Sequence, residues 1–282
     1  MKPFESTLIC RGKILDLSIP VVMGILNATP NSFYTGHLDF SEQQWIDVAG
    51  QMVVDGATLL DVGGMSSKPG AEFVSMQEEL DRILPVITAL IKHVPEPLIS
   101  VDTFRSEVAK EALECGIHII NDISGGELDN DLPTVVQQHG AAYICMHMQG
   151  IPETMQHAPT YSHVVNEIAD YFKDKINHFT AIGLDNVILD PGFGFGKTIA
   201  HNYELLAQLN SFHRFGKPLL VGLSRKSMIC KPLNISPKSA LNGTTALHMA
   251  ALQQGTNILR VHDVKEAKEC ILLHQYLQHK LP

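Results

Sequence analysis

Two cationic side chains, Arg260 and His262, stand two residues apart in an apolar run that ends as ILRVHD (258–263). Side chains alternate across a β-strand, so both would point to the same face. An arginine buried there without a partner costs free energy, and an anionic ligand would remove that cost. Arginine beside histidine suits a phosphate or pyrophosphate, because the guanidinium offers two parallel donors. An internal salt bridge to Asp61 or Asp190 is the alternative explanation.

A second cationic group follows another apolar run in GLSRKS (222–227). Ser224, Arg225 and Lys226 would sit where barrels of alternating strands and helices often bind phosphate. A helix that begins near Ser227 would add free backbone amides to such an anion site. The alternative is an ordinary solvated Arg-Lys pair.

An asparagine closes the first apolar run, in MGILNATPNSF (23–33), where Asn27 shares the inward parity of Met23 and Ile25. A neutral amide oxygen in this place can ligate Mg²⁺ without a cage of carboxylates. Asn27 can equally be a polar end to the strand. A glycine-rich loop, DVGGMSSKPGA (61–71), follows the second run and is a weak candidate for a lid.

Three further polar residues, Asp102, Asn121 and Asp190, end three other apolar runs. Carboxylates that accept two parallel N–H bonds suit a flat heterocycle with an N–C–N edge. Met146 and Phe195 would supply the apolar faces of a slot for that ring. A methionine in such a place is more often plain core, and this alternative stays open.

The stretch DPGFGFGKT (190–198) ends like a phosphate-binding P-loop, but it does not fit that template. The template needs a glycine five residues before Gly196, where Pro191 stands with a fixed φ and no amide hydrogen. We therefore expect Asp190 to carry recognition, and Lys197 and Thr198 merely to start the next helix.

Zinc and hydrolase chemistry find little support. His147 lies two residues beyond Cys145, but no other cysteine or histidine has ligand spacing. No G-x-S-x-G elbow or Ser-His-Asp order is present, which argues against hydrolase chemistry.

The elements that must position these residues are eight apolar runs separated by helix-like patterns. The runs are 20–27, 58–63, 97–102, 118–123, 141–147, 186–191, 218–224 and 258–263. Alternating strands and helices indicate a parallel sheet, and eight such units favour a TIM (β/α)8 barrel over a doubly wound sheet. We expect one domain over 1–282, with residues 6–19 as a short hairpin at the barrel's N-terminal end.

The overall composition limits the possible partners and the cellular location. The chain has 282 residues, 45% of them hydrophobic, and a net charge of −9, which argues against nucleic acid or anionic membrane as a partner. No apolar stretch is long enough to span a membrane. The N-terminus is too polar for a secretory signal, and five cysteines without a C-x-x-C indicate reduced thiols. The expected location is cytoplasmic.

Taken together, these stretches closely resemble the dihydropteroate synthase family of pterin-binding TIM barrels, over nearly the whole chain. The matching stretches are SVDTFR (100–105), INDISGG (120–126), MHMQGIPETMQ (146–156), DPGFGFGKT (190–198), GLSRKSM (222–228) and RVHDVKE (260–266). The resemblance implies a transferase of folate biosynthesis, a homodimer and a sulfonamide target. The family condenses 6-hydroxymethyl-7,8-dihydropterin pyrophosphate with p-aminobenzoate, yielding 7,8-dihydropteroate and pyrophosphate with Mg²⁺.

The resemblance also implies a role for each candidate residue. Those matching the pterin contacts are Asp102, Asn121, Asp190 and Lys226, in a slot lined by Met146, Phe195 and Gly222. Those matching the pyrophosphate and Mg²⁺ site are Asn27, Arg260 and His262, which with Lys226 would be the catalytic residues. Those matching the enclosure of p-aminobenzoate are Thr29, Pro30, Ser67, Lys68, Pro69 and, near its carboxylate, Ser227.

Two loops depart from the family's usual pattern. Asn31 and Thr35 replace acids in the first loop, and Met65 and Lys68 replace a glutamate and an arginine in the second, where Ser67 also replaces a threonine. Two alternatives remain beside the synthase, and only the second rests on these loop departures. One is a pterin-dependent methyltransferase domain, which has no need of a pyrophosphate site; the other is a non-catalytic pterin-binding homologue with impaired lids.

Overall fold

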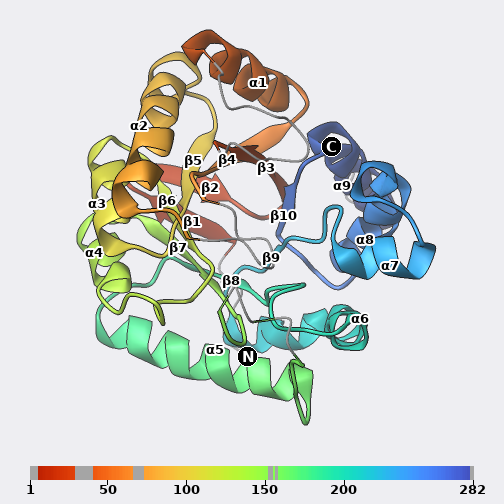
Figure 1. Ribbon diagram of the computed structural model, residues 1–282. Helices are drawn as coiled ribbons and strands as arrows, with labels where there is room; N and C mark the ends of the chain where they lie inside the picture. Colours follow the sequence, from red (N-terminus) through yellow and green to blue (C-terminus); the bar gives the residue numbers. More distant parts are fainter. Residues whose placement is uncertain (1–5, 29–40, 66–72, 152–154, 156–157, 280–282) are drawn as a thin grey trace.

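The computed structural model describes residues 6–28, 41–65, 73–151, 155 and 158–279, which form a ring of strands inside a ring of helices (Figure 1). The strands are β1 (Thr7–Cys10), β2 (Lys13–Asp16), β3 (Val21–Asn27), β4 (Ala57–Gly63), β5 (Leu98–Asp102), β6 (Ile119–Asp122), β7 (Ala142–Met146), β8 (Val187–Asp190), β9 (Leu220–Val221) and β10 (Ile258–Val261). The α-helices are α1 (Glu42–Val54), α2 (Met76–His93), α3 (Ser106–Glu114), α4 (Leu132–Gln138), α5 (Val164–Ala181), α6 (Ile199–Ala207), α7 (Ser227–Leu233), α8 (Leu241–Gln253) and α9 (Val264–Leu277).

The strands β3 to β10 form the barrel that the sequence predicts. Their order in the sheet is β8-β7-β6-β5-β4-β3-β10-β9, and every pairing within it is parallel. A parallel bridge between Leu189 and Leu219 joins the two edges, so the barrel is nearly closed. All eight carboxyl ends consequently meet at one rim, which we call the barrel mouth.

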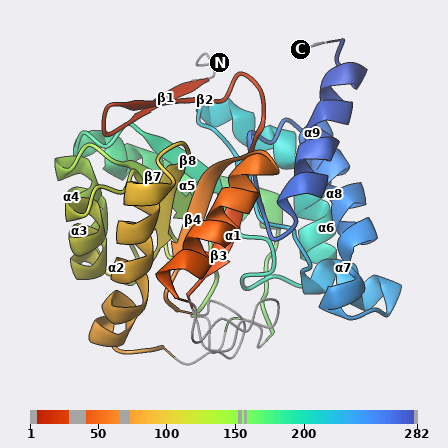
Figure 2. The same cartoon turned by 90° about the horizontal axis from the view of Figure 1, so that it is seen from above.

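The predicted hairpin is the antiparallel pair β1–β2, which lies across the other end of the barrel (Figure 2). Its inward side chains pack against the layer of barrel residues that lies farthest from the mouth. The members of this buried cluster are Leu8, Cys10, Leu15, Leu17, Val21, Met23, Leu59, Leu98, Ile119, Ala142, Ile144, Ile188, Leu220 and Ile258. The hairpin therefore closes the end opposite the mouth and keeps the interior dry.

Replacing Leu15 with alanine is expected to lower the free energy of unfolding by about 2–5 kcal/mol, because the side chain is 1% exposed and leaves a cavity. Ile14 is the matched control, since it is next in sequence and 70% exposed. Its alanine variant is expected to stay within about 0.5 kcal/mol of the wild type. Urea denaturation measures the free energy of unfolding of both variants, and equal losses would contradict the packing of the hairpin against the barrel interior.

Helix ends largely follow the local sequence. Ser41 caps α1, and its side chain and that of Gln44 form a capping box. Gly116 follows the last residues of α3 with φ 107°, the left-handed region that favours glycine. Pro85 lies inside α2, which continues through it as one helix. In the part of the chain that is described, no helix combines the length and apolarity of a membrane span.

Candidate active site

The strand ends bring the candidate residues to the barrel mouth. Asn27, Asp102, Met146 and Asp190 are the last residues of β3, β5, β7 and β8, and Asn121 is the last but one of β6. Because strands β3 to β8 follow one another in a parallel sheet, these side chains lie along one part of the rim. Segments far apart in the chain therefore share a single site.

Arg260 lies at the centre of the polar side chains. Its Nε donates to Oδ2 of Asp61 at 2.6 Å and its Nη2 donates to Oδ2 of Asp102 at 2.9 Å. The same Asp61 oxygen accepts a bond of 2.9 Å from Nδ2 of Asn121. The internal salt bridge weighed for Arg260 thus exists, with Asp102 rather than Asp190 as its second carboxylate.

These salt bridges leave Arg260 able to meet an anion. Its side chain is 19% exposed at the mouth, and neither salt bridge uses Nη1, which has no hydrogen-bond acceptor among the residues described. The two carboxylates hold the guanidinium plane in place and keep its charge, since a buried cation needs such partners. A preorganised arginine of this kind loses little side-chain entropy when a phosphate arrives.

Asp61 is the site residue that sequence reasoning undervalued, because it was named only as a partner for Arg260. Its carboxylate is buried, and Oδ1 has no hydrogen-bond partner among the described residues. The available signal was an aspartate within the otherwise apolar run TLLDVG, on the inward parity of Leu59. A lone carboxylate in the middle of a buried strand needs a partner, and here it orients Arg260 and Asn121.

The pKa of Asp102 is raised to about 7 by burial, a rise that Arg260 opposes and the negative charge of Asp61 reinforces. Asn27 lies close by, because Gly63 of β4 pairs with both residues and separates them. A Cβ at Gly63 would lie 3.7 Å from Oδ1 of Asn27 and 3.6 Å from Cβ of Asp102. The glycine therefore leaves this part of the mouth open.

Lys226 forms the opposite wall. Its Nζ donates to the carbonyl of Phe193 and lies 4.8 Å from the ring centroid of Phe195, a cation–π contact. A Cβ at Gly222 would come within 3.6 Å of the same Nζ. Burial lowers the pKa of Lys226 to about 8, while the charge of Asp190 opposes the fall.

Asp190 is 6% exposed, and its Oδ1 accepts a bond of 2.8 Å from the amide of Gly192. Burial raises the pKa of Asp190, and the charge of Lys226 is the largest opposing effect. An apolar surface lies next to this carboxylate. Its buried members are Met65, Phe104, Ile123 and Met146, and Phe195 packs against them. The mouth thus combines an apolar slot with a polar edge, as a flat heterocycle requires.

The second cationic stretch divides into two parts. Oγ of Ser224 lies 2.9 Å from Nδ1 of His262, which brings that histidine to the mouth beside β10. Arg225, a candidate for anion binding, instead makes a two-pronged salt bridge with Asp263, at 2.8 Å from Nε and 2.6 Å from Nη2. It fixes the turn rather than facing a ligand. Ser227 is the first residue of α7 and is exposed.

The expectation for the end of DPGFGFGKT is half right. Thr198 caps α6 through a capping box with His201. Lys197, however, is 2% exposed and donates to backbone carbonyls and to His147. It does more than start a helix. Nδ1 of His147 lies 3.0 Å from Nζ of Lys197, and the described residues hold no group of three or more His, Cys, Asp or Glu placed for a metal.

Several loop candidates lie outside the described residues, namely Thr29, Pro30, Asn31, Thr35, Ser67, Lys68 and Pro69. Met65, by contrast, is described and is 8% exposed in the apolar surface of the slot. At this position the chain therefore presents a hydrophobic wall where the family commonly has a glutamate.

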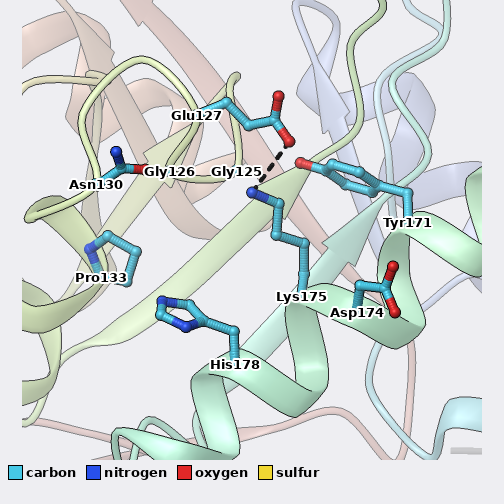
Figure 3. A pocket seen from close by; sticks show the side chains of 9 residues that line it. All are labelled: Gly125, Gly126, Glu127, Asn130, Pro133, Tyr171, Asp174, Lys175 and His178. Carbon is cyan, nitrogen blue, oxygen red and sulfur yellow. Dashed lines mark ion pairs between the residues drawn. The ribbon is translucent and has the colours of Figure 1, made fainter.

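A separate cavity of about 400 Å³ lies outside the barrel, between the loop after β6 and α5 (Figure 3). Lys175 and Glu127 pair across it at 3.2 Å, and the hydroxyl of Tyr171 at its wall donates to the carbonyl of Met146 at 3.1 Å. None of the candidate site residues lines this cavity. The converging polar groups are at the mouth, so the mouth is the candidate active site.

Comparison with known proteins shows the family to which the chain belongs. Residues 23–262 match the family model described as pterin binding enzyme. The chain is 47% identical over 266 residues to the dihydropteroate synthase of Escherichia coli (strain K12), covering 94% of each chain. It is 42% identical over 271 residues to that of Haemophilus influenzae, covering 95% of this chain and 98% of the relative.

Solved structures show the same likeness. The dihydropteroate synthase of Yersinia pestis with a sulfonamide drug complex has a TM-score of 0.92 and 44% identity, over 97% of this chain and 99% of that one. The enzyme of Xanthomonas albilineans with 4-aminobenzoic acid has a TM-score of 0.89 and 36% identity, over 97% and 98%.

Proposed function

The chain belongs to the dihydropteroate synthase family of pterin-binding enzymes, and from this premise we propose that the barrel mouth joins a dihydropterin to p-aminobenzoate. The reaction condenses 6-hydroxymethyl-7,8-dihydropterin pyrophosphate with p-aminobenzoate and yields 7,8-dihydropteroate and pyrophosphate. The observation that best supports this site is the convergence of Asp61, Asp102, Asn121 and Arg260 within hydrogen-bond distance at one rim. A folate-pathway transferase needs a polar edge for the pterin and a cationic end for the leaving group.

The pterin ring enters the slot between Met146 and Phe195. Asp190 accepts two parallel N–H bonds from its aminopyrimidine edge, and Asp102 and Asn121 complete the polar rim. Lys226 donates to the ring, since its ammonium already lies over Phe195 at the slot wall. Gly222 leaves room beside that ammonium, because a side chain there would contact Nζ.

The pyrophosphate lies towards Arg260 and His262, whose cationic and hydrogen-bonding groups stabilise the departing negative charge. The residues present suit Mg²⁺ that is held mainly by the substrate: one amide oxygen, Asn27 Oδ1, next to the opening at Gly63, and no carboxylate cage among the described residues. Bound there, Mg²⁺ would neutralise charge on the pyrophosphate.

The chemical step is dissociative. The bond from the methylene carbon to the pyrophosphate oxygen breaks, the oxygen keeps the electron pair, and the pterin ring shares the positive charge. The neutral aniline nitrogen then attacks the methylene and releases a proton to solvent, so no strong base is needed. By resemblance, Ser227 at the start of α7 would face the carboxylate of p-aminobenzoate, and Thr29, Ser67, Lys68 and Pro69 would enclose that substrate.

Pyrophosphate release tests the function. The protein is mixed with the pterin pyrophosphate and Mg²⁺, with and without p-aminobenzoate, and 7,8-dihydropteroate is measured in parallel. We expect stoichiometric pyrophosphate and dihydropteroate that require both substrates and fall when Mg²⁺ is chelated. Pterin binding without any product would instead favour the non-catalytic homologue, for which the apolar Met65 is the structural argument. Equal affinity for the bare pterin and for the pterin pyrophosphate would favour a pterin-dependent methyltransferase domain.

The pKa values at the mouth predict a narrow pH range for pterin binding. Below about 7 the carboxyl of Asp102 is protonated and accepts fewer bonds, because burial raises its pKa. Above about 8 the amine of Lys226 is neutral, because burial lowers its pKa. Affinity for a bare pterin, measured by calorimetry, should therefore peak between these two values. Arginine keeps its charge at high pH, so Lys226→Arg should remove the alkaline decline, and an unchanged decline would contradict the assignment.

We extend the proposal to assembly and location. The family resemblance implies a homodimer. Exposed apolar side chains on α7 and α9 support a face for self-association, because four of them are more than half exposed: Leu233, Leu273, Tyr276 and Leu277. Light scattering on the purified protein measures this directly. A cytoplasmic location suits the cysteines, because all five are free thiols.

A further inference from the structure

The Nζ group of Lys197 is buried without touching a carboxylate, and burial lowers its pKa to about 7. Its residue is 2% exposed, and its Nζ donates to the carbonyl oxygens of Gly192 at 2.9 Å and Phe195 at 3.0 Å. Nδ1 of His147 lies 3.0 Å away and the carbonyl of the same residue 3.3 Å away. Buried lysines are normally paired with acids, so a shell of carbonyl oxygens and one imidazole is unusual.

This shell joins two loops that leave adjacent strands. His147 follows β7, and Gly192 and Phe195 follow β8. The loops touch backbone to backbone, because a Cβ at Gly192 would lie 2.0 Å from the carbonyl oxygen of His147. Gly192 has φ 71°, so only glycine accepts both the conformation and the close approach. Two carbonyl-lined backbones in such contact need a donor between them, and Lys197 supplies it.

The joined loops carry one whole wall of the pterin slot. Met146 and Asp190 are register partners at the ends of β7 and β8, directly before the two loops. The ring of Phe195 and the carbonyl of Phe193 hold the ammonium of Lys226. Any shift of the loop after β8 would therefore move the residues that face the ring.

Helix initiation does not explain the lysine. The start of α6 is already capped by Thr198 and His201, and Asn202 binds the backbone of Lys197 and Thr198 through its own amide. An apolar chain of the same length would fill the space but would leave the carbonyl oxygens of Phe195 and His147 and Nδ1 of His147 without a donor among the described residues, which is costly. The imidazole of His147 accepts in its neutral form, since burial lowers its pKa to about 2.

We propose that Lys197 is a positioning residue for the pterin slot, its ammonium occupying a carbonyl-lined cation site that locks the loop after β7 to the loop after β8. It acts through Phe195, Phe193 and Lys226 and touches no substrate. This inference rests on the proposed function, because it assigns the locked wall to pterin binding. The site is one that a small free cation with N–H groups would also fit.

Chemical rescue tests the proposal. In Lys197→Ala the site is expected to be empty, and the KM for the pterin pyrophosphate should rise by about 10- to 100-fold, the range for a misplaced binding group. The KM for p-aminobenzoate should change much less. Adding n-propylammonium should restore most of the loss, because it replaces the missing chain and its N–H donors. Lys197→Met fills the space without a donor, so it should show the same defect and no rescue.

Controls separate this role from general stability. Lys217 is the matched variant, because its Nζ also donates to a backbone carbonyl, that of Asp185 at 2.8 Å, at the far end of β8. Lys217→Ala should keep wild-type kinetics and ignore propylammonium. Tetramethylammonium, a cation without N–H groups, should rescue nothing.

The outcomes are distinguishable. Wild-type kinetics in both Lys197 variants, or a defect in the alanine variant that propylammonium leaves unchanged, would overturn the proposal. Loss of the fold in both variants would also overturn it, because a group that only positions the slot wall leaves the barrel core intact. A wild-type protein that makes no dihydropteroate would refute the proposed function instead, and pterin affinity would then report on Lys197 alone.

Discussion

Replacing Arg260 with alanine is expected to lower the free energy of unfolding by about 3–5 kcal/mol at about pH 8, the usual result of breaking a buried ion pair. The side chains of Asp61 and Asp102 are 0% and 12% exposed, and both lose their only cationic hydrogen-bond partner among the described residues. Two carboxylates on the neighbouring strands β4 and β5 are then left without their cation. Urea denaturation of the ligand-free protein measures the loss.

The loss should depend on pH with a definite sign. The pKa of Asp102 is raised in the folded protein, to about 7, so its protonated form stabilises the fold and that stability disappears as pH rises through this value. Without Arg260 the pKa rises further. The deficit of Arg260→Ala should therefore be small at about pH 5 and largest at about pH 8.

A double variant supplies the control for this pair. Removing Asp61 as well as Arg260 leaves one buried carboxylate instead of two, so the double alanine variant should recover part of the stability that Arg260→Ala loses. Additive losses, or a deficit that is the same at both pH values, would contradict the electrostatic account. In ligand binding, Arg260→Ala should weaken a pyrophosphate-bearing pterin more than a bare pterin, and equal losses would refute the pyrophosphate role.

Asp190→Asn is expected to weaken binding of a bare pterin by about 2–5 kcal/mol, the cost of truncating one half of a buried charged contact. The carboxylate is 6% exposed and already accepts the amide of Gly192. An asparagine would turn an N–H donor towards the donors of the pterin edge, or give up the contact with Gly192. Titration calorimetry measures the effect.

The control for this variant lies just before the same strand. Asp185 precedes β8 at the opposite end of the barrel and is exposed, so Asp185→Asn removes the same charge without reaching the mouth. Its pterin affinity should equal that of the wild type. An Asp190→Asn variant with unchanged affinity would remove Asp190 from the site.

Much of the architecture was accessible without coordinates. Eight apolar runs with helix patterns between them predicted the barrel, and residues 6–19 were predicted to form the hairpin at its N-terminal end. These signals are local, because periodicity and turn chemistry depend on neighbours a few residues apart. Strand β9 is shorter than its apolar run, since residues 218–224 form regular pairs only at 220 and 221.

Partners of individual side chains were decided by the tertiary structure. Strand parity placed Arg260 on the inner face, but the carboxylates it binds lie 199 and 158 residues away in the chain. Arg225 stood in the same motif as Lys226, and only the fold shows that it pairs with Asp263. For Lys197, sequence suggested a helix start, whereas the contact between two loops makes it a buried donor.

The chain's own pattern therefore determined which residues reach the barrel mouth, because a parallel strand carries its last residues to a common rim whatever its neighbours are. Only the closure of the strands into a barrel decided which of those residues can bind a ligand and which bind each other. Charge pairing acts over a few ångströms, and those distances exist only after residues hundreds of positions apart have been brought together.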